Sequence, residues 1–165
     1  MPHITALFPA AVLAAGLLAA PSAHAQATPA PQVAAEGAWA RATPAGAKVG
    51  AVYATLTSPA ADTLLGVSTP ASRVAEVHEM TMDGGVMRMR ELAGGLPLPA
   101  GQPVTLRPGG LHIMLVDLAA PLKAGDTVQL RLSFAHSAPV EVTARVAAIG
   151  AAGPPGSAAP AMKMP

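Results

Sequence analysis

Apolar and polar residues alternate with a period of two along much of the chain. The clearest run covers residues 127–134, and the same alternation recurs over 140–146 and 87–90. Because successive side chains of a β-strand point to opposite faces, each run predicts a strand with one buried face. Short apolar stretches predict six further strands, at residues 38–42, 50–57, 63–68, 75–80, 104–106 and 111–118.

Turn sequences separate the predicted strands. Asp83-Gly84-Gly85 and Pro108-Gly109-Gly110 are typical examples. Between the turns, no segment has the periodicity of an amphipathic helix. Many short strands divided by turns predict an all-β fold, a sandwich or a barrel. Trp39 and Tyr53 are expected to anchor its core or a sheet edge.

The first residues have the features of an export signal. Residues 6–20 are apolar but too few for a membrane-spanning helix, and the small-residue pattern Ala23-His24-Ala25 follows them. We therefore expect a signal peptide at 1–25, cleaved before Gln26, with no stable membrane insertion afterwards. The alternative is an uncleaved membrane anchor.

Composition divides the rest of the chain into three parts. Residues 26–35 are rich in Ala, Pro and Gln and are expected to be a flexible lead-in. Residues 36–148 are expected to form one folded domain. Residues 149–165 are rich in Gly, Pro and Ala and are expected to be a disordered tail.

Charge and cysteine content exclude several classes of function. Ten Lys and Arg against nine Asp and Glu give a net charge of +1, with no basic stripe, so nucleic acid is not an expected partner. The absence of cysteine excludes disulfides, thiolate zinc sites, iron–sulfur clusters, cysteine nucleophiles and blue-copper centres. By contrast, the chain has eight Met but only one Trp, one Tyr and two Phe.

Histidine and methionine concentrate in two short segments. After residue 25 the chain has three His and seven Met, and two of these His and five of these Met lie within 78–89 and 112–114. That concentration is more than the packing of a core requires, and it makes these segments the candidate metal site.

Strand periodicity brings the members of each segment together. Residues i and i+2 share a face, so His78 and Met80 are expected to point the same way, as are His112 and Met114. Two such pairs on neighbouring strands would converge on one metal ion. Met89 lies past a predicted turn, on a strand that would fold back beside the first.

Imidazole and thioether donors together favour Cu(I). Thioether sulfur is neutral and soft, and it binds hard cations such as Ca²⁺ poorly. Zinc normally recruits Cys or carboxylates beside His. Because thioethers neither form disulfides nor need deprotonation, they suit an oxidising compartment. They also hold Cu(I) less tightly than thiolates do, which favours passing the metal on.

Other His and Met residues have simpler interpretations. Methionine commonly fills gaps in cores, so Met82 or Met87, which flank the turn, is expected to be a core residue or a shield beside the site. His136 is expected in a loop. Met162 and Met164 in the tail are further possible contacts for copper.

Several motifs between residues 39 and 146 are shared with one known family. They are residues 39–42 (WARA), 50–53 (GAVY), 62–67 (DTLLGV), 78–89, 108–114 (PGGLHIM) and 121–128 (PLKAGDTV). On these motifs the chain resembles the periplasmic copper chaperone PCu(A)C family, over nearly the whole folded region. The family pattern is a His, ten residues, a Met, about twenty-one residues and His-x-Met. Here ten residues separate His78 from Met89, and 22 separate Met89 from His112, so one extra residue falls in the loop at 93–102.

The resemblance implies a ligand set, a fold and a function. The copper ligands carry over as His78, Met89, His112 and Met114, with Met80 as a weaker candidate. The implied fold is a single cupredoxin-like Greek-key β-sandwich that binds Cu(I) near its surface. The implied function is delivery of copper in the periplasm, without enzymatic turnover, to a recipient such as the copper centre of cytochrome c oxidase or its assembly factor.

Two other classes of function are alternatives to a copper chaperone. A copper- or redox-dependent enzyme is disfavoured because the sequence has no Cys, no three-His cluster and no two-His-one-carboxylate triad. A metal-free, immunoglobulin-like interaction module of the cell envelope remains as the alternative. A copper titration of the purified domain distinguishes it from a chaperone.

Overall fold

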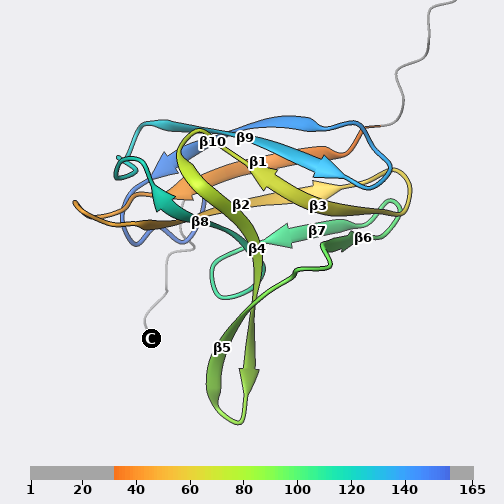
Figure 1. Ribbon diagram of the computed structural model, residues 1–165, viewed down its shortest axis with the longest axis horizontal. Coiled ribbons are helices and arrows are strands. Elements are labelled where there is room, and N and C mark those ends of the chain that lie inside the picture. The colour runs from red at the N-terminus through yellow and green to blue at the C-terminus, as the bar shows by residue number, and fades with distance from the viewer. Residues whose placement is uncertain (1–31, 157–165) are drawn as a thin grey trace, which may run out of the picture.

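The computed structural model describes residues 32–156, which contain ten β-strands and no helix (Figure 1). The strands are β1 (Ala34–Arg41), β2 (Val49–Thr57), β3 (Asp62–Ser68), β4 (Ser72–Asp83), β5 (Val86–Glu91), β6 (Leu96–Leu98), β7 (Pro103–Leu106), β8 (His112–Leu118), β9 (Thr127–Phe134) and β10 (Val140–Ala147). The all-β prediction is confirmed. In this part of the chain, no helix is long and apolar enough to cross a membrane.

The strands form one hydrogen-bonded path that folds into two layers. Its order is β5-β4-β8-β2-β1-β10-β9-β3-β6, and β7 adds to β2. β1 joins the layers because it pairs antiparallel with β2 and parallel with β10. In Figure 1, β9 and β10 lie at the top of the molecule and β6, β7 and β8 lie below them.

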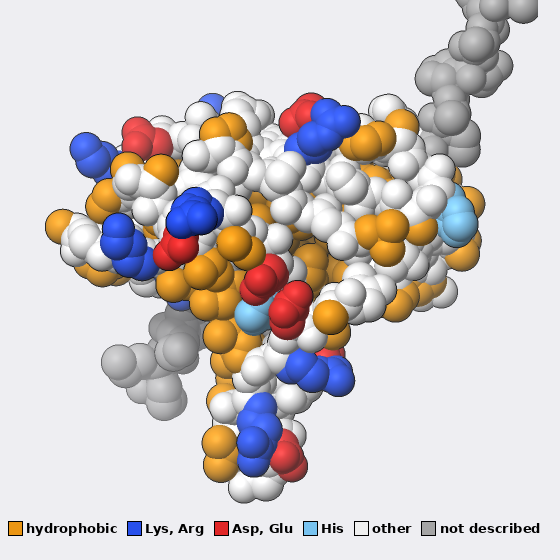
Figure 2. Space-filling model, in the orientation of Figure 1, with side chains coloured by type: hydrophobic (Ala, Val, Ile, Leu, Met, Phe, Trp, Pro, Cys, Tyr) orange, Lys and Arg blue, Asp and Glu red, His pale blue; other side chains and the backbone are white. Residues whose placement is uncertain are grey.

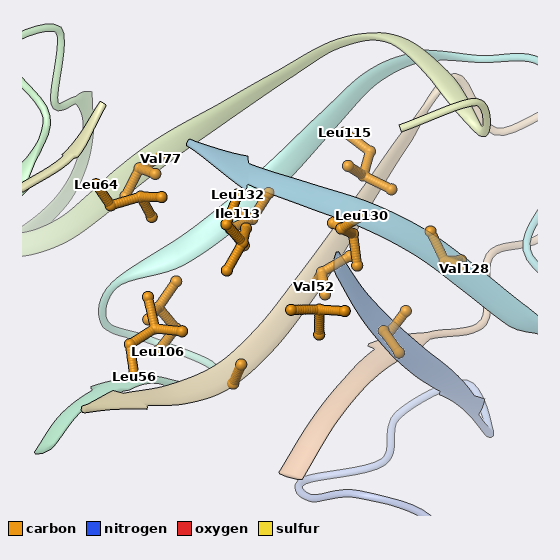
Figure 3. Packing of buried hydrophobic residues seen from close by; sticks show 14 of the residues in the cluster. Val52, Leu56, Leu64, Val77, Leu106, Ile113, Leu115, Val128, Leu130 and Leu132 are labelled. Carbon is orange, nitrogen blue, oxygen red and sulfur yellow. The ribbon is translucent and has the colours of Figure 1, made fainter. Parts of the chain in front are cut away.

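Alternating aliphatic side chains fill the space between the layers. The buried residues of β9 are Val128, Leu130, Leu132 and Phe134, as the period of two predicts. Figure 3 shows Leu130 and Leu132 close to residues from β2 and β8, namely Val52, Ile113 and Leu115. Since the inward residues form the core, the intervening residues of β2, β4 and β8 point to the outer face of their layer.

The β4–β5 hairpin projects from this body (Figure 1). Its two-residue turn consists of Gly84 (φ 56°) and Gly85 (φ 81°). A type I′ turn needs positive φ at both central residues, which glycine adopts without a steric penalty, so the predicted turn is confirmed. The alternation at residues 87–90 predicted a strand with one buried face. The strand is present as β5, but the prediction of a buried face was wrong, because all six of its residues are exposed.

The limits of the fold differ from the predicted ones at two further places. β1 begins at Ala34, inside the expected lead-in, because Ala34 and Ala35 pair with Thr57 and Leu56 of β2, and the preceding Val33 is buried in the core. β6 was not predicted, since its three residues are too few to show a period. The expected signal peptide lies outside the described residues. Of the expected tail, residues 149–156 are described, and Ala151 packs beside Trp39 and Tyr53.

Candidate metal centre

The two histidines of the predicted site lie side by side on the outer face of the sheet. β4 and β8 pair antiparallel, with Val77 opposite Ile113 and His78 opposite His112. Val77 and Ile113 are buried in the core, so the histidines that follow and precede them point the other way. Their ring centroids are 5.9 Å apart.

The three predicted methionines share this outer face. Met114 follows His112 by two residues on β8, and therefore points with it. β5 pairs with the free edge of β4, where Met89 is directly opposite Met80. Residues directly opposite in an antiparallel pair project to the same side. The topology thus brings all five residues singled out in the sequence to one face, spread over β4, β5 and β8.

His112 is buried and its ring orientation is fixed by the backbone. Its Nδ1 lies 3.0 Å from the carbonyl oxygen of Gly110. A carbonyl can only accept, so Nδ1 carries the proton and the neutral ring has its lone pair on Nε2. The same carbonyl accepts the backbone N–H of Met80 at 3.3 Å, which ties this turn to β4. His112 is therefore preset to donate through Nε2.

His78 is held by a carboxylate on its own strand. Its Nε2 lies 3.0 Å from Oε2 of Glu76, which precedes it by two residues on the same face. Nε2 donates to the carboxylate, so the free lone pair of the neutral ring is on Nδ1. That nitrogen is buried and has no hydrogen-bond partner. An unsatisfied buried nitrogen costs about 1–3 kcal/mol, and a bound metal ion is one group that would satisfy it.

A groove of about 300 Å³ runs along the outer face beside these residues. Met89, His112 and Met114 line it from β5 and β8, and Tyr53 and the segment 41–44 also line it. His78 and Met80 are not among its lining residues. Met89 is half exposed, whereas His112 is buried, so the groove leads from solvent to the imidazole.

Two residues that line the groove, Arg41 and Tyr53, lie in one cluster with Trp39. Trp39 and Tyr53 are both buried, with ring centroids 4.5 Å apart. The guanidinium of Arg41 lies 5.9 Å from the Tyr53 ring centroid and donates to the carbonyl of Ala151. Burial raises the pKa of the Tyr53 phenol, and the nearby Arg41 opposes this rise only in part. Tyr53 therefore stays neutral at physiological pH.

The donor set of this face is imidazole nitrogen and thioether sulfur. Over residues 32–156, no group of three or more His, Cys, Asp or Glu is placed to hold a metal ion. Hard cations prefer oxygen donors, and zinc normally recruits Cys or carboxylates beside His. The imidazole and thioether side chains that share this face suit a soft ion such as Cu(I).

The other predicted His and Met positions fall away from the groove. Met82 and Met87 lie near the tip of the hairpin and are exposed, so of the two expected roles, a core residue or a shield beside the site, the core role was wrong. His136 is exposed in the loop after β9, as predicted. Met162 and Met164 lie outside the described residues.

Some residues of the site were not found from the sequence. Glu76 carried a usable signal, because its spacing of two from His78 places both on one strand face. The carbonyl of Gly110 and the wall formed by 41–44 carried none. They depend on which strands pair, because β8 is placed by its ladders with both β4 and β2.

Residues 33–146 match the model of the LpqE-like lipoprotein family, which is well over half of the chain. The chain belongs to this family. A lipoprotein of Leifsonia xyli subsp. xyli is 40% identical over 81 residues, covering 48% of this LpqE-like chain and 49% of the relative. The chain thus spans about half the length of the curated relative it matches.

Solved structures similar to this LpqE-like chain are PCuAC domains. The Cu(I) form of DR1885 from Deinococcus radiodurans is 33% identical with a TM-score of 0.56, covering 76% of this chain and 83% of that one. A copper-bound PCuAC domain from PmoF2 is 25% identical with a TM-score of 0.58, covering 71% and 93%. The predicted cupredoxin-like β-sandwich is therefore confirmed.

Proposed function

We propose that this domain is a copper chaperone that binds one Cu(I) ion on the outer face of β4, β5 and β8. The observation that carries the proposal is the register of these strands, which sets His78 opposite His112 and Met89 opposite Met80. The copper-bound state of two similar structures supports the choice of metal.

Each proposed ligand has a distinct place at the site. His112 would donate through Nε2, because the carbonyl of Gly110 holds its other nitrogen. Met114 and Met89 would donate thioether sulfur into the groove, which they line together with His112. His78 would donate through the unpartnered Nδ1. Met80, opposite Met89, is the weaker candidate.

The exposure of the site favours transfer of the metal over its retention or catalysis. Met89 is half exposed on a projecting hairpin, and the groove opens beside it. A ligand from another protein can therefore approach the metal while the buried imidazole of His112 still holds it. All proposed ligands are neutral, so copper can be exchanged without moving a proton to or from a thiolate.

Export of the chain and delivery to the respiratory chain complete the proposal. The chain belongs to a family of lipoproteins, and a lipoprotein is among its relatives, which supports an exported location. We infer a periplasmic protein with a cleaved signal peptide at 1–25. Its recipient would be a copper protein such as the copper centre of cytochrome c oxidase or its assembly factor.

A copper titration with X-ray absorption tests the metal site. Anaerobic Cu(I), added against a competing chelator, should bind at about one ion per chain, with sulfur and nitrogen neighbours as expected for thioether and imidazole. The variant Met114→Leu keeps the apolar volume but removes one of the proposed sulfur ligands, so its Cu(I) affinity should be lower and its sulfur scattering reduced. A spectrum that shows oxygen and nitrogen neighbours of the metal but no sulfur would contradict the proposed ligands. No binding at all would favour the metal-free interaction module.

A further inference from the structure

A second pair of methionines lies further out on the hairpin than the proposed site. Met82 on β4 is directly opposite Met87 on β5, and the two are 66% and 48% exposed. We call them the outer pair, and the opposed Met80 and Met89 the inner pair. Both pairs project to the same face, because their members are two residues apart on each strand.

The outer pair is not explained by packing or by a uniformly apolar tip. The opposite face of the hairpin carries two ion pairs, Arg88 with Asp83 at 3.0 Å and Arg90 with Glu79 at 2.9 Å. Figure 2 shows hydrophobic side chains along one edge of the hairpin and charged ones beside them. A thioether-bearing face and a charged face therefore run back to back along an otherwise solvated element.

We propose that Met82 and Met87 form an outer, low-affinity Cu(I) site that relays copper to and from the inner site. The proposal rests on the proposed function, because it needs the inner site as its destination. Directly opposite residues have Cβ atoms about 4.5–5.5 Å apart. Both sulfurs, at the ends of flexible side chains, can therefore reach one ion.

The spacing of the pairs suits transfer in short steps. Residues two apart on a strand are separated by about 6.8 Å, so the outer pair is one such step from the inner pair. The inner pair is one step from the position of His78, which lies opposite His112. An ion held by the outer pair gains a bond to an inner-pair sulfur before it loses one to Met82 or Met87. Copper stays in the +1 state, and neither an electron nor a proton moves.

The ligand sets give the relay a direction. The outer pair offers two exposed thioethers and no imidazole, so it binds weakly and releases readily. The inner site adds the buried His112 and the sulfur of Met114. Copper entering at the tip therefore moves toward the core, and a recipient that docks at the tip can draw it out again.

Methyl NMR of the full chain with labelled methionine tests the outer pair. The first equivalent of anaerobic Cu(I) should shift the methyl signals of Met89 and Met114. Excess Cu(I) should then shift those of Met82 and Met87. In the double variant Met82→Leu/Met87→Leu, which keeps an apolar tip, the affinity for the first equivalent should be unchanged. Its loading from a Cu(I)–chelator complex should be several-fold slower.

Val86→Ala is the matched control, because Val86 is equally exposed at the tip but carries no sulfur and lies on the charged face. It should load at the rate of the unchanged protein. The proposal is overturned if no Cu(I) excess shifts the outer pair, or if the double Leu variant loads as fast as the control. Failure of the first equivalent to shift Met89 and Met114 would instead overturn the proposed inner site, so the two failures are distinguishable.

Discussion

At the scale of single residues, hydrogen bonds decide which nitrogen each histidine offers. His112 is set by a backbone carbonyl and His78 by the carboxylate of Glu76. Such partners fix the tautomer and the ring orientation of a metal-binding histidine and raise its basicity. A substitution at Glu76 therefore tests the geometry of the site without removing any proposed ligand.

Glu76→Ala is expected to lower Cu(I) affinity by about 10–100-fold, the usual effect of removing the partner of a ligating histidine. Affinity is measured by competition with a chelator. Glu91→Ala is the matched control, because Glu91 has the same charge and lies opposite His78 on β5. If both variants lose affinity equally, the effect comes from charge near the site and not from orientation of the ring.

Residues on the two faces of the sheet are expected to separate stability from binding. Leu132 is fully buried between the layers, so Leu132→Ala should lower the free energy of unfolding by about 2–4 kcal/mol. Met114 lies on the outer face, and Met114→Leu should leave that free energy nearly unchanged while it weakens Cu(I) binding. Chemical denaturation and chelator competition on both variants measure the two effects. A large loss of stability in Met114→Leu would make that residue structural.

At the scale of elements, the hairpin can change without the core. Its residues beyond Met80 are exposed, and its turn depends on two glycines with positive φ. Gly84→Val/Gly85→Val forces β-branched residues into that region, at a cost of about 1–2 kcal/mol each. Cu(I) affinity should fall, and the amides of β5 should be less protected from hydrogen exchange. The protection of the β9 amides should not change. Equal losses in β5 and β9 would show that the hairpin is coupled to global unfolding.

The elements also show what the sequence could and could not predict. β9 and β10 were predicted because every second residue is buried, and that alternation is visible in the chain. β6 was not, because two leucines around a proline show no period. For the site, the shared face of His112 and Met114 follows from spacing alone. The position of β4 between β5 and β8 does not follow from spacing, because strand order depends on the whole chain.

At the scale of the whole molecule, one buried carboxylate connects β3 to the loop between β9 and β10, in the layer opposite the metal site. Asp62 begins β3 and accepts backbone N–H groups from Thr63, His136 and Ser137, at 2.7, 3.0 and 2.8 Å. Two of these lie in the loop between β9 and β10, so the bonds connect strands far apart in sequence. Burial alone would raise the pKa of Asp62. Hydrogen bonds from the Ser137 side chain and from the three N–H groups outweigh it and lower the pKa to about 2.

This pKa predicts how the fold responds to acid. The folded value is about 2 and the ordinary value is 3.8, so the ionised carboxylate stabilises the fold above about pH 4. That stabilisation should be lost as pH falls from about 4 to about 2.

Asp62→Ala should lower the free energy of unfolding by about 1–3 kcal/mol above this range, because it leaves buried donors unpaired. It should also flatten the dependence of stability on pH within the range. Glu141→Ala is the control, since Glu141 forms only an exposed ion pair with Arg131 and should keep the slope of the unchanged protein. Denaturation curves from about pH 2 to 7 on the three proteins measure this, and an Asp62→Ala slope as steep as that of the control would contradict it.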